Sequence, residues 1–227
     1  MLSNCESSAN MASTKNHRFV FIRHAEATCN LQDEHVLISS VMPDSSLTTV
    51  GQQQAQLLAN SIPKELIGGK IFSSPMTRAM QTANFLTTRH NLPLVSDERL
   101  EEVRIEPSLT PALTLSEWDA MLQERLDNPT INVRPEVETV AEQKARVTDF
   151  LCQRHQERGK EKVTVIVSHA FTIELAIFVL LGLEVSLLRH WRIRISNSAL
   201  HIIENEEIGG KSRLVLTNAK NHLRLWL

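Results

Sequence analysis

Two runs of mostly apolar, strand-forming residues, 19–22 and 163–167, each lead directly into polar residues, and this repeated arrangement constrains the fold most. Arg23 and His24 follow the first run, and His169 follows the second after one serine. Such runs are typical of strands buried on both faces, as in a parallel sheet covered by helices. Arginine and histidine are costly to bury there unless a partner or ligand uses them. Because ligands of open α/β sheets bind outside the carboxyl ends of the strands, the sequence predicts a site for a small anionic substrate.

Further strands alternate with helices along the chain, which predicts an α/β fold. The predicted strands are residues 19–22, 71–72, 94–95, 163–167, 200–203 and 214–217. This alternation is typical of a three-layer sandwich, in which a mainly parallel sheet is covered by helices on both faces. Gly209 and Gly210 indicate a hairpin between the last two strands, so we expect one antiparallel strand in the sheet.

Residues suited to helix N-termini mark where several helices begin. Thr48 is positioned to cap a helix that ends before the next proline, and Thr139 with Glu142 forms a capping box. Pro75 is expected at the first position of another helix, with Arg78 in its first turn. Free N–H groups at that N-terminus favour an anion, and the planar guanidinium of arginine matches phosphate oxygens.

The composition excludes some classes of function. The chain has 227 residues and a formal net charge of −2, so nucleic-acid binding is not expected as its main role. Its three cysteines, Cys5, Cys29 and Cys152, indicate neither a disulfide framework nor a zinc site and fit a reducing, cytoplasmic compartment. Residues 1–16 lack the apolar core of a secretory signal and are expected to form a disordered tail. The apolar stretch 171–183 is too short to span a membrane, so a buried helix and no membrane partner are expected.

Three motifs give the chain a resemblance to a known family. Residues 23–30 read Arg-His-Ala-Glu-Ala-Thr-Cys-Asn, close to an Arg-His-Gly-Glu motif with an asparagine a few residues on. Residues 73–83 match Ser-Ser-Pro-x-x-Arg-Ala-x-Gln-Thr-Ala almost letter for letter, and residues 168–170 read Ser-His-Ala where the family has Ser-His-Gly. Over about residues 18–225, the chain resembles the histidine phosphatase superfamily in its phosphoglycerate-mutase-like branch. The resemblance implies the fold of that branch in a single domain, residues 17–227.

The resemblance also implies a catalytic acid and a cap. The family has its acid in a pattern like Leu-x-Glu-Ile, and residues 100–103 read Leu-Glu-Glu-Val, which selects Glu102. Glu101 is the first alternative and Glu106 the second. In related enzymes the insertion after the acid covers the active site and shapes specificity. Here that insertion corresponds to residues around 104–135, which we expect to form a helical cap.

The roles implied by the resemblance suit phosphoryl transfer. His24 attacks phosphorus and forms a phosphohistidine, because neutral imidazole is a good nucleophile. Arg23 and Arg78 hold the phosphoryl oxygens through the transition state. His169, protonated beside the phosphate, donates a further hydrogen bond. Glu102 protonates the leaving oxygen and then activates water.

The implied enzyme is a metal-independent phosphomonoesterase that acts on a small phosphorylated substrate. Asn30 and Ala170 complete the expected phosphate- and substrate-binding set, and the scheme requires no cofactor and no metal. A cofactor-dependent phosphoglycerate mutase-like phosphotransferase uses the same site, but its Arg-His-Tyr-Gly stretch is replaced here by Val-Arg-Ile-Glu at 103–106. A non-catalytic phosphate-binding scaffold is the third interpretation. The sequence leaves the physiological substrate and the oligomeric state open.

Overall fold

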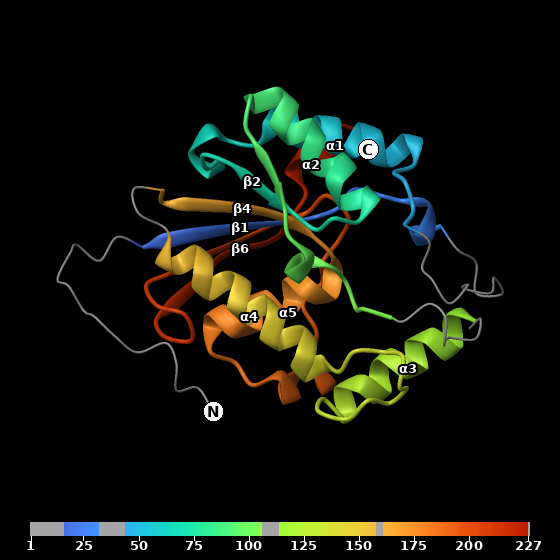
Figure 1. Cartoon of the computed structure of the whole chain (residues 1–227). Helices are drawn as coiled ribbons and strands as arrows, with labels where there is room; N and C mark the ends of the chain where they lie inside the picture. The colour runs from blue at the N-terminus through green and yellow to red at the C-terminus, as the bar shows by residue number, and fades with distance from the viewer. Residues whose placement is uncertain (1–15, 32–43, 106–113, 158–160, 227) are drawn as a thin grey trace.

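A computed structural model of the chain describes residues 16–31, 44–105, 114–157 and 161–226 (Figure 1). Two of the features expected from the sequence fall outside these stretches. They are the N-terminal tail, except for its last residue, and Glu106, the second alternative for the acid.

The strands in these stretches form a six-stranded sheet in the order β3-β2-β4-β1-β5-β6. They are β1 (His17–Arg23), β2 (Ile71–Ser73), β3 (Leu94–Ser96), β4 (Val163–Ser168), β5 (Leu200–Asn205) and β6 (Ser212–Ala219). The strands β1 to β4 pair in parallel, β5 is antiparallel to β1, and β6 is antiparallel to β5. The sheet is therefore mainly parallel with one strand, β5, running against the rest, which confirms the predicted fold class.

Helices cover both faces of the sheet. The described α-helices are α1 (Thr49–Ser61), α2 (Thr77–His90), α3 (Leu115–Asp127), α4 (Val140–Gln156) and α5 (Ala170–Leu181). The short 3₁₀ segments are η1 (Thr28–Asn30), η2 (Lys64–Leu66), η3 (Glu98–Leu100), η4 (Val185–Arg189) and η5 (Asn221–Trp226). In Figure 1, α1 and α2 lie on one side of the sheet, α4 and α5 lie on the other, and α3 lies apart from the sheet. In the part of the chain that the structure describes, no helix is long and apolar enough to cross a membrane.

Alternate side chains of β1 enter the two cores between the sheet and its helices. Phe19 and Phe21 pack with residues of α4 and α5, whereas Val20 and Ile22 pack with residues of α1 and α2. All four side chains are at most 1% exposed. Burying each of them stabilises the fold by about 2 kcal/mol. The apolar run was therefore correctly interpreted as a strand covered on both faces.

The predicted caps of α1 and α4 are confirmed. The Thr48 hydroxyl accepts a hydrogen bond from the Gly51 N–H at 2.9 Å, and Thr139 and Glu142 bond reciprocally at 3.0 and 2.7 Å. Gly51 also allows a close approach, because a Cβ at this position would lie 1.9 Å from the Glu26 carbonyl oxygen. Only glycine lets the loop after β1 pack this closely against α1.

The prediction that Pro75 begins a helix is wrong, because α2 begins two residues later, at Thr77. The Ser74 N–H still donates to the Val167 carbonyl at 3.0 Å, so the chain continues alongside β4 beyond the end of β2. Met76 remains extended, with φ −60° and ψ 136°, and is the N-cap. Arg78 lies in the first turn of α2, as predicted.

Candidate active site

The parallel pairing of β1 with β4 brings the two motif histidines together. Arg23 is paired with Ser168, so His24 and His169 are the next residues on two neighbouring strands. The His24 N–H donates to the Ser168 carbonyl at 2.9 Å, and the two imidazole centroids are 5.2 Å apart. Both histidines lie at the carboxyl edge of the sheet and are almost fully buried.

The hydrogen bonds of His24 define which ring nitrogen carries the proton. Its Nδ1 lies 2.8 Å from the Ala25 carbonyl oxygen, and a carbonyl only accepts, so Nδ1 carries the proton. The Nε2 atom accepts from the Arg78 Nε–H at 3.3 Å and therefore presents a lone pair. Burial lowers the pKa of His24 well below 6.5, and the charges of Arg78 and Arg23 lower it further. The imidazole is thus neutral at pH 7, and its Nε2 lone pair points at the Arg78 guanidinium.

Arg78 is a buried cation that has no acidic partner within the described part of the chain. It is 2% exposed and lies in the first turn of α2. Besides the bond to His24, its Nη2 donates only to the Met76 sulfur at 3.4 Å, and its buried Nη1 has no partner among the described residues. A buried charge without a counter-ion is costly. This arrangement is typical of a site that binds an anion.

Arg23 adds a second positive charge beside His24. Its Nη1 donates to the Ile195 carbonyl at 2.7 Å, while its buried Nε has no partner within the described stretches. Burial lowers the pKa of Arg23, and the charge of Glu102 opposes that effect. Guanidinium groups nevertheless stay protonated in proteins, so the end of β1 remains positively charged.

In the protein without a ligand, the surroundings of His169 favour its neutral form, whereas the sequence led us to expect protonation beside a bound phosphate. Burial lowers its pKa well below 6.5, and His24, Arg78 and Arg23 lower it further. Its Nε2 lies 2.8 Å from the Ser74 hydroxyl oxygen, and its buried Nδ1 has no partner among the residues described. The protein's own charges therefore favour neutral imidazole. A phosphate dianion bound beside the ring acts in the opposite direction and favours the protonated form.

The Glu102 carboxylate is held at the N-terminus of α5. It accepts hydrogen bonds from the Phe171 N–H at 3.1 Å and the Thr172 hydroxyl at 3.2 Å, and from the Gln143 side chain at 3.3 Å. Ala170, which the sequence placed in the substrate-binding set, is the first residue of this helix. These bonds orient the Glu102 side chain at the start of the helix that follows His169.

The carboxylate of Glu101 has different partners from that of Glu102. It accepts from the Arg104 Nε–H at 2.7 Å, at an exposed position. The two neighbouring glutamates are thus distinguished by the partners of their carboxylates and not by their positions in the sequence.

Arg146 holds the backbone of the segment that carries both glutamates. Its guanidinium donates to the carbonyls of Arg99, Glu101 and Glu102, each at 2.8 Å. It also forms an ion pair of 2.5 Å with Glu138, both side chains being mostly buried. With its donors bound to three carbonyls and a carboxylate, Arg146 fixes the position of the segment that carries Glu102.

The loop around Asn30 is tied to the first histidine through Asn197. The Asn197 side chain donates to the His24 carbonyl at 3.1 Å and to the Asn30 Oδ1 at 3.0 Å. Asn30 Oδ1 also accepts from the Ala27 N–H at 3.1 Å, so its oxygen is used locally. Ser198, at φ 59°, donates its N–H to the His24 carbonyl at 3.3 Å. These bonds fix the turn that carries His24 and occupy the side-chain oxygen of Asn30.

Sequence reasoning did not identify several residues that organise the site. They are Ser74, Gln143, Arg146, Thr172 and Asn197. Ser74 lies inside the motif at 73–83, which was the available signal. The contacts that define the roles of Gln143, Arg146 and Asn197 are to residues 41 to 173 positions away, so no local pattern reveals them.

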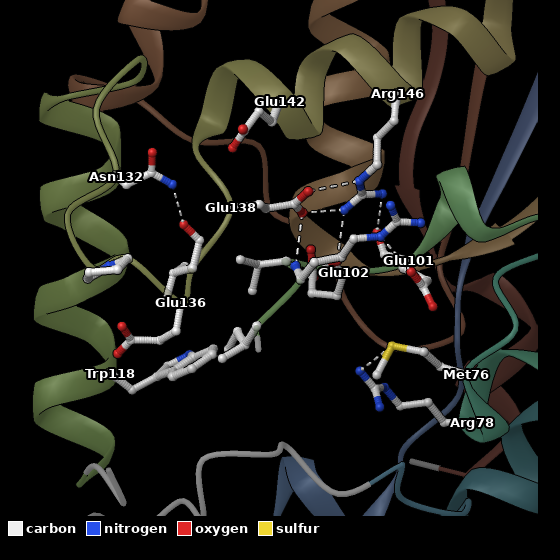
Figure 2. A pocket seen from close by; sticks show the side chains of 15 residues that line it. Met76, Arg78, Glu101, Glu102, Trp118, Asn132, Glu136, Glu138, Glu142 and Arg146 are labelled. Carbon is white, nitrogen blue, oxygen red and sulfur yellow. Dashed lines mark hydrogen bonds and ion pairs between the residues drawn. The ribbon is translucent and has the colours of Figure 1, made fainter. Parts of the chain in front are cut away.

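A cavity of about 790 Å³ opens beside Arg78 and Glu102 (Figure 2). Its lining extends from these residues to Trp118 of α3 and to Glu136 and Glu138, which precede α4. This volume is in the range typical of small-molecule sites. Among the described residues, no cluster of three or more histidine, cysteine, aspartate or glutamate side chains is arranged to hold a metal ion.

The geometry agrees with a comparison to protein families. The profile of the histidine phosphatase superfamily, branch 1, matches residues 19–219. The chain belongs to the histidine phosphatase superfamily. This histidine phosphatase therefore has the fold and the class of activity that its motifs implied, and it is a phosphoric monoester hydrolase.

Some relatives of this histidine phosphatase are named as phosphatases and others as probable phosphoglycerate mutases. It is 34% identical to 5''-phosphoribostamycin phosphatase from Niallia circulans, over 91% of this chain and 98% of the relative. It is 31% identical to putative phosphoserine phosphatase 2 from Hydrogenobacter thermophilus, with the same coverage. Its fold is similar to a crystal structure of a phosphoserine phosphatase mutant from Entamoeba histolytica in complex with phosphoserine. The TM-score is 0.70 at 22% identity, over 91% of this chain and 99% of the other.

Proposed function

We propose that this histidine phosphatase hydrolyses small phosphate monoesters through a phosphohistidine formed on His24 Nε2, without a metal ion. The observation that carries the proposal is the pairing of a neutral His24, whose Nε2 presents a lone pair, with the buried and unneutralised guanidinium of Arg78. A nucleophile and an anion-binding cation are thus adjacent. Phosphoryl transfer requires little else beyond charge stabilisation and a proton donor.

In the first step His24 Nε2 attacks phosphorus, an Nε2–P bond forms, and the P–O bond to the leaving group breaks. Arg78 and Arg23 stabilise the charge on the phosphoryl oxygens. His169 donates a hydrogen bond to the same oxygens once the substrate dianion has raised its pKa. Glu102 in its acid form donates a proton to the leaving oxygen, which departs as an alcohol.

In the second step Glu102 accepts a proton from water, and the resulting hydroxide attacks phosphorus. The Nε2–P bond breaks, inorganic phosphate leaves, and His24 and Glu102 return to their starting states. Glu102 is preferred over Glu101 because its carboxylate lies at the N-terminus of α5, directly after His169, whereas that of Glu101 is paired with Arg104. Acid–base catalysis of this kind contributes roughly 10²- to 10⁴-fold to the rate.

The test is hydrolysis of an aryl phosphate in the presence of a chelator, together with detection of a phosphorylated histidine after quenching in alkali, in which phosphohistidine is stable. We expect turnover and an acid-labile phosphoenzyme in the wild type, and neither in His24→Asn. His90→Asn, the same change at the end of α2 and outside the site, is the matched control and is expected to retain both. Activity that survives in His24→Asn would refute the nucleophile.

The same experiment separates the alternative functions. A phosphoglycerate mutase transfers the phosphoryl group from histidine to a phosphoglycerate faster than to water. A non-catalytic scaffold binds vanadate or phosphate but forms no phosphoenzyme. We expect water to be the preferred acceptor, and a substrate panel that includes phosphoserine and phosphorylated sugars then ranks the candidate substrates.

A further inference from the structure

The cavity beside the phosphate site has an acidic lining, which is unusual for a site that receives a phosphate dianion. Its charged residues include three arginines, Arg78, Arg104 and Arg146, and five glutamates, Glu101, Glu102, Glu136, Glu138 and Glu142. Apart from the arginine at the phosphate end, the wall carries more carboxylates than guanidinium groups. A substrate that is anionic throughout is repelled by such a wall. A substrate that is cationic beyond its phosphate is attracted.

Four of these five carboxylates have partners within the protein, and three of them are held as follows. Glu138 is paired with Arg146, and Glu101 is paired with Arg104. Glu102 accepts hydrogen bonds from the start of α5. These groups shape the cavity, but their charges are largely compensated within the protein.

Glu136 stands apart from the others. No hydrogen bond or ion pair involves its carboxylate in the stretches that the structure describes, although the side chain is only partly exposed and lines the cavity. Glu142, by comparison, uses its carboxylate to cap α4 through Thr139. Glu136 is therefore the acidic group best placed to accept a ligand cation.

Trp118 provides an aromatic surface in the same wall. Its ring is 8% exposed, belongs to α3 and packs with Val137, the residue after Glu136. Figure 2 shows the Trp118 ring and the Glu136 side chain on the same side of the cavity. An ammonium group between a carboxylate and the face of an indole gains both an ion pair and a cation–π interaction.

The opposite end of the cavity contains an independent sign of a ligand. Arg78 lines it there, and its buried Nη1 atom lacks a partner among the described residues. One cavity thus joins an unneutralised buried cation to an unneutralised carboxylate. This distribution fits a molecule that is negative at one end and positive at the other.

We propose that Trp118 and Glu136 form a subsite for a protonated amino group, so that the preferred substrates are phosphate monoesters of amino compounds, such as amino sugars or amino alcohols. The inference rests on the proposed function, because it requires that the substrate phosphate lies at Arg78. The amino group is held by charge and aromatic contact, whereas the phosphate is held at the carboxyl edge of the sheet.

Glucosamine 6-phosphate and glucose 6-phosphate provide a matched pair of probes, because they differ only in an ammonium or a hydroxyl group at C2. Each is tested as a competitive inhibitor of aryl phosphate hydrolysis. We expect the amino compound to bind about tenfold more tightly to the wild type, which corresponds to one partly shielded ammonium contact. The ratio of the two inhibition constants is the readout, so a general loss of affinity cancels.

Variants assign that ratio to the subsite. Glu136→Gln and Trp118→Leu are each expected to bring the ratio towards one. Glu124→Gln, an exposed position of α3 that does not line the cavity, is the matched control and is expected to keep the ratio near ten.

The outcomes separate this inference from the proposed function. Equal inhibition constants in the wild type, or a ratio unchanged in Glu136→Gln, would overturn the amine subsite while aryl phosphate hydrolysis still supports the phosphatase mechanism. If no aryl phosphate is hydrolysed, the proposed function fails, and calorimetry of the two sugar phosphates gives the ratio directly. A ratio near ten that depends on Glu136 then upholds the subsite, and a ratio of one overturns it.

Discussion

Replacing Arg78 by methionine is expected to stabilise the fold while it removes activity. The guanidinium is 2% exposed, and no carboxylate contacts it among the described residues. Its hydrogen bonds are weak, because the one to His24 Nε2 is long at 3.3 Å and the other, at 3.4 Å, is to the Met76 sulfur, a weak acceptor. If Arg78 binds the substrate phosphate as proposed, its charge serves ligand binding at the expense of stability.

The size of the effect follows from these contacts. A buried ion without a partner destabilises a protein by several kcal/mol, and its removal relieves that penalty. The two weak hydrogen bonds that are lost, to His24 and to Met76, together contribute about 1–2 kcal/mol. Methionine keeps the apolar stem packed. The net gain in the free energy of unfolding is about 1–3 kcal/mol, which raises Tm by roughly 3–10 °C in a chain of this length.

Arg125 offers a matched control, because it is also 2% exposed. Its Nη2 donates to the Gln143 side chain at 3.0 Å and its Nε donates to the Glu138 carbonyl at 3.1 Å. Its guanidinium also lies 5.7 Å from the centre of the Phe171 ring. Because these partners are left unsatisfied, Arg125→Met is expected to lose about 1–3 kcal/mol.

Both variants are compared with the wild type by urea denaturation and by aryl phosphate hydrolysis. The expected pattern is a more stable, inactive Arg78→Met and a less stable Arg125→Met. If Arg78→Met loses as much stability as Arg125→Met, the argument that Arg78 is electrostatically unsatisfied is refuted. If Arg78→Met turns over at the wild-type rate, its role in phosphate binding is refuted instead.

Two further predictions concern the proposed acid, Glu102, and one buried histidine, His201. Glu102→Gln is expected to lower kcat roughly 10²- to 10³-fold in steady-state assays, whereas Glu101→Gln changes it only a few-fold, and the reverse order would reassign the acid. Burial lowers the pKa of His201 to about 4, so between pH 6.5 and 4 the unfolded chain binds a proton that the folded chain does not. Stability should therefore fall by about 3 kcal/mol through this group as the pH decreases over that range. Urea denaturation of His201→Gln should show a shallower decline, and identical pH profiles would contradict the assignment.

Local patterns determined much of the fold. The apolar runs predicted β1 and β4, and Thr48 and Thr139 predicted the starts of α1 and α4, because burial and capping depend on residues that are close in sequence. The rule that ligands bind at the carboxyl ends of parallel strands was enough to predict that His24 and His169 lie at the same edge of the sheet. The start of α2 could not be predicted from Pro75, because hydrogen bonding to β4 extends the chain before the helix forms.

Tertiary structure alone decided how the site is charged and oriented. Glu101 and Glu102 are neighbouring residues of the same type, so residue type does not distinguish their roles. In the structure the Glu101 carboxylate binds Arg104, whereas the Glu102 carboxylate binds the N-terminus of α5. The depressed pKa of His169 arises from burial and from cations on other elements. The acidic wall of the cavity is likewise assembled from separate segments. Desolvation and electrostatic interactions depend on distances in space, so a linear sequence names the groups but does not specify their surroundings.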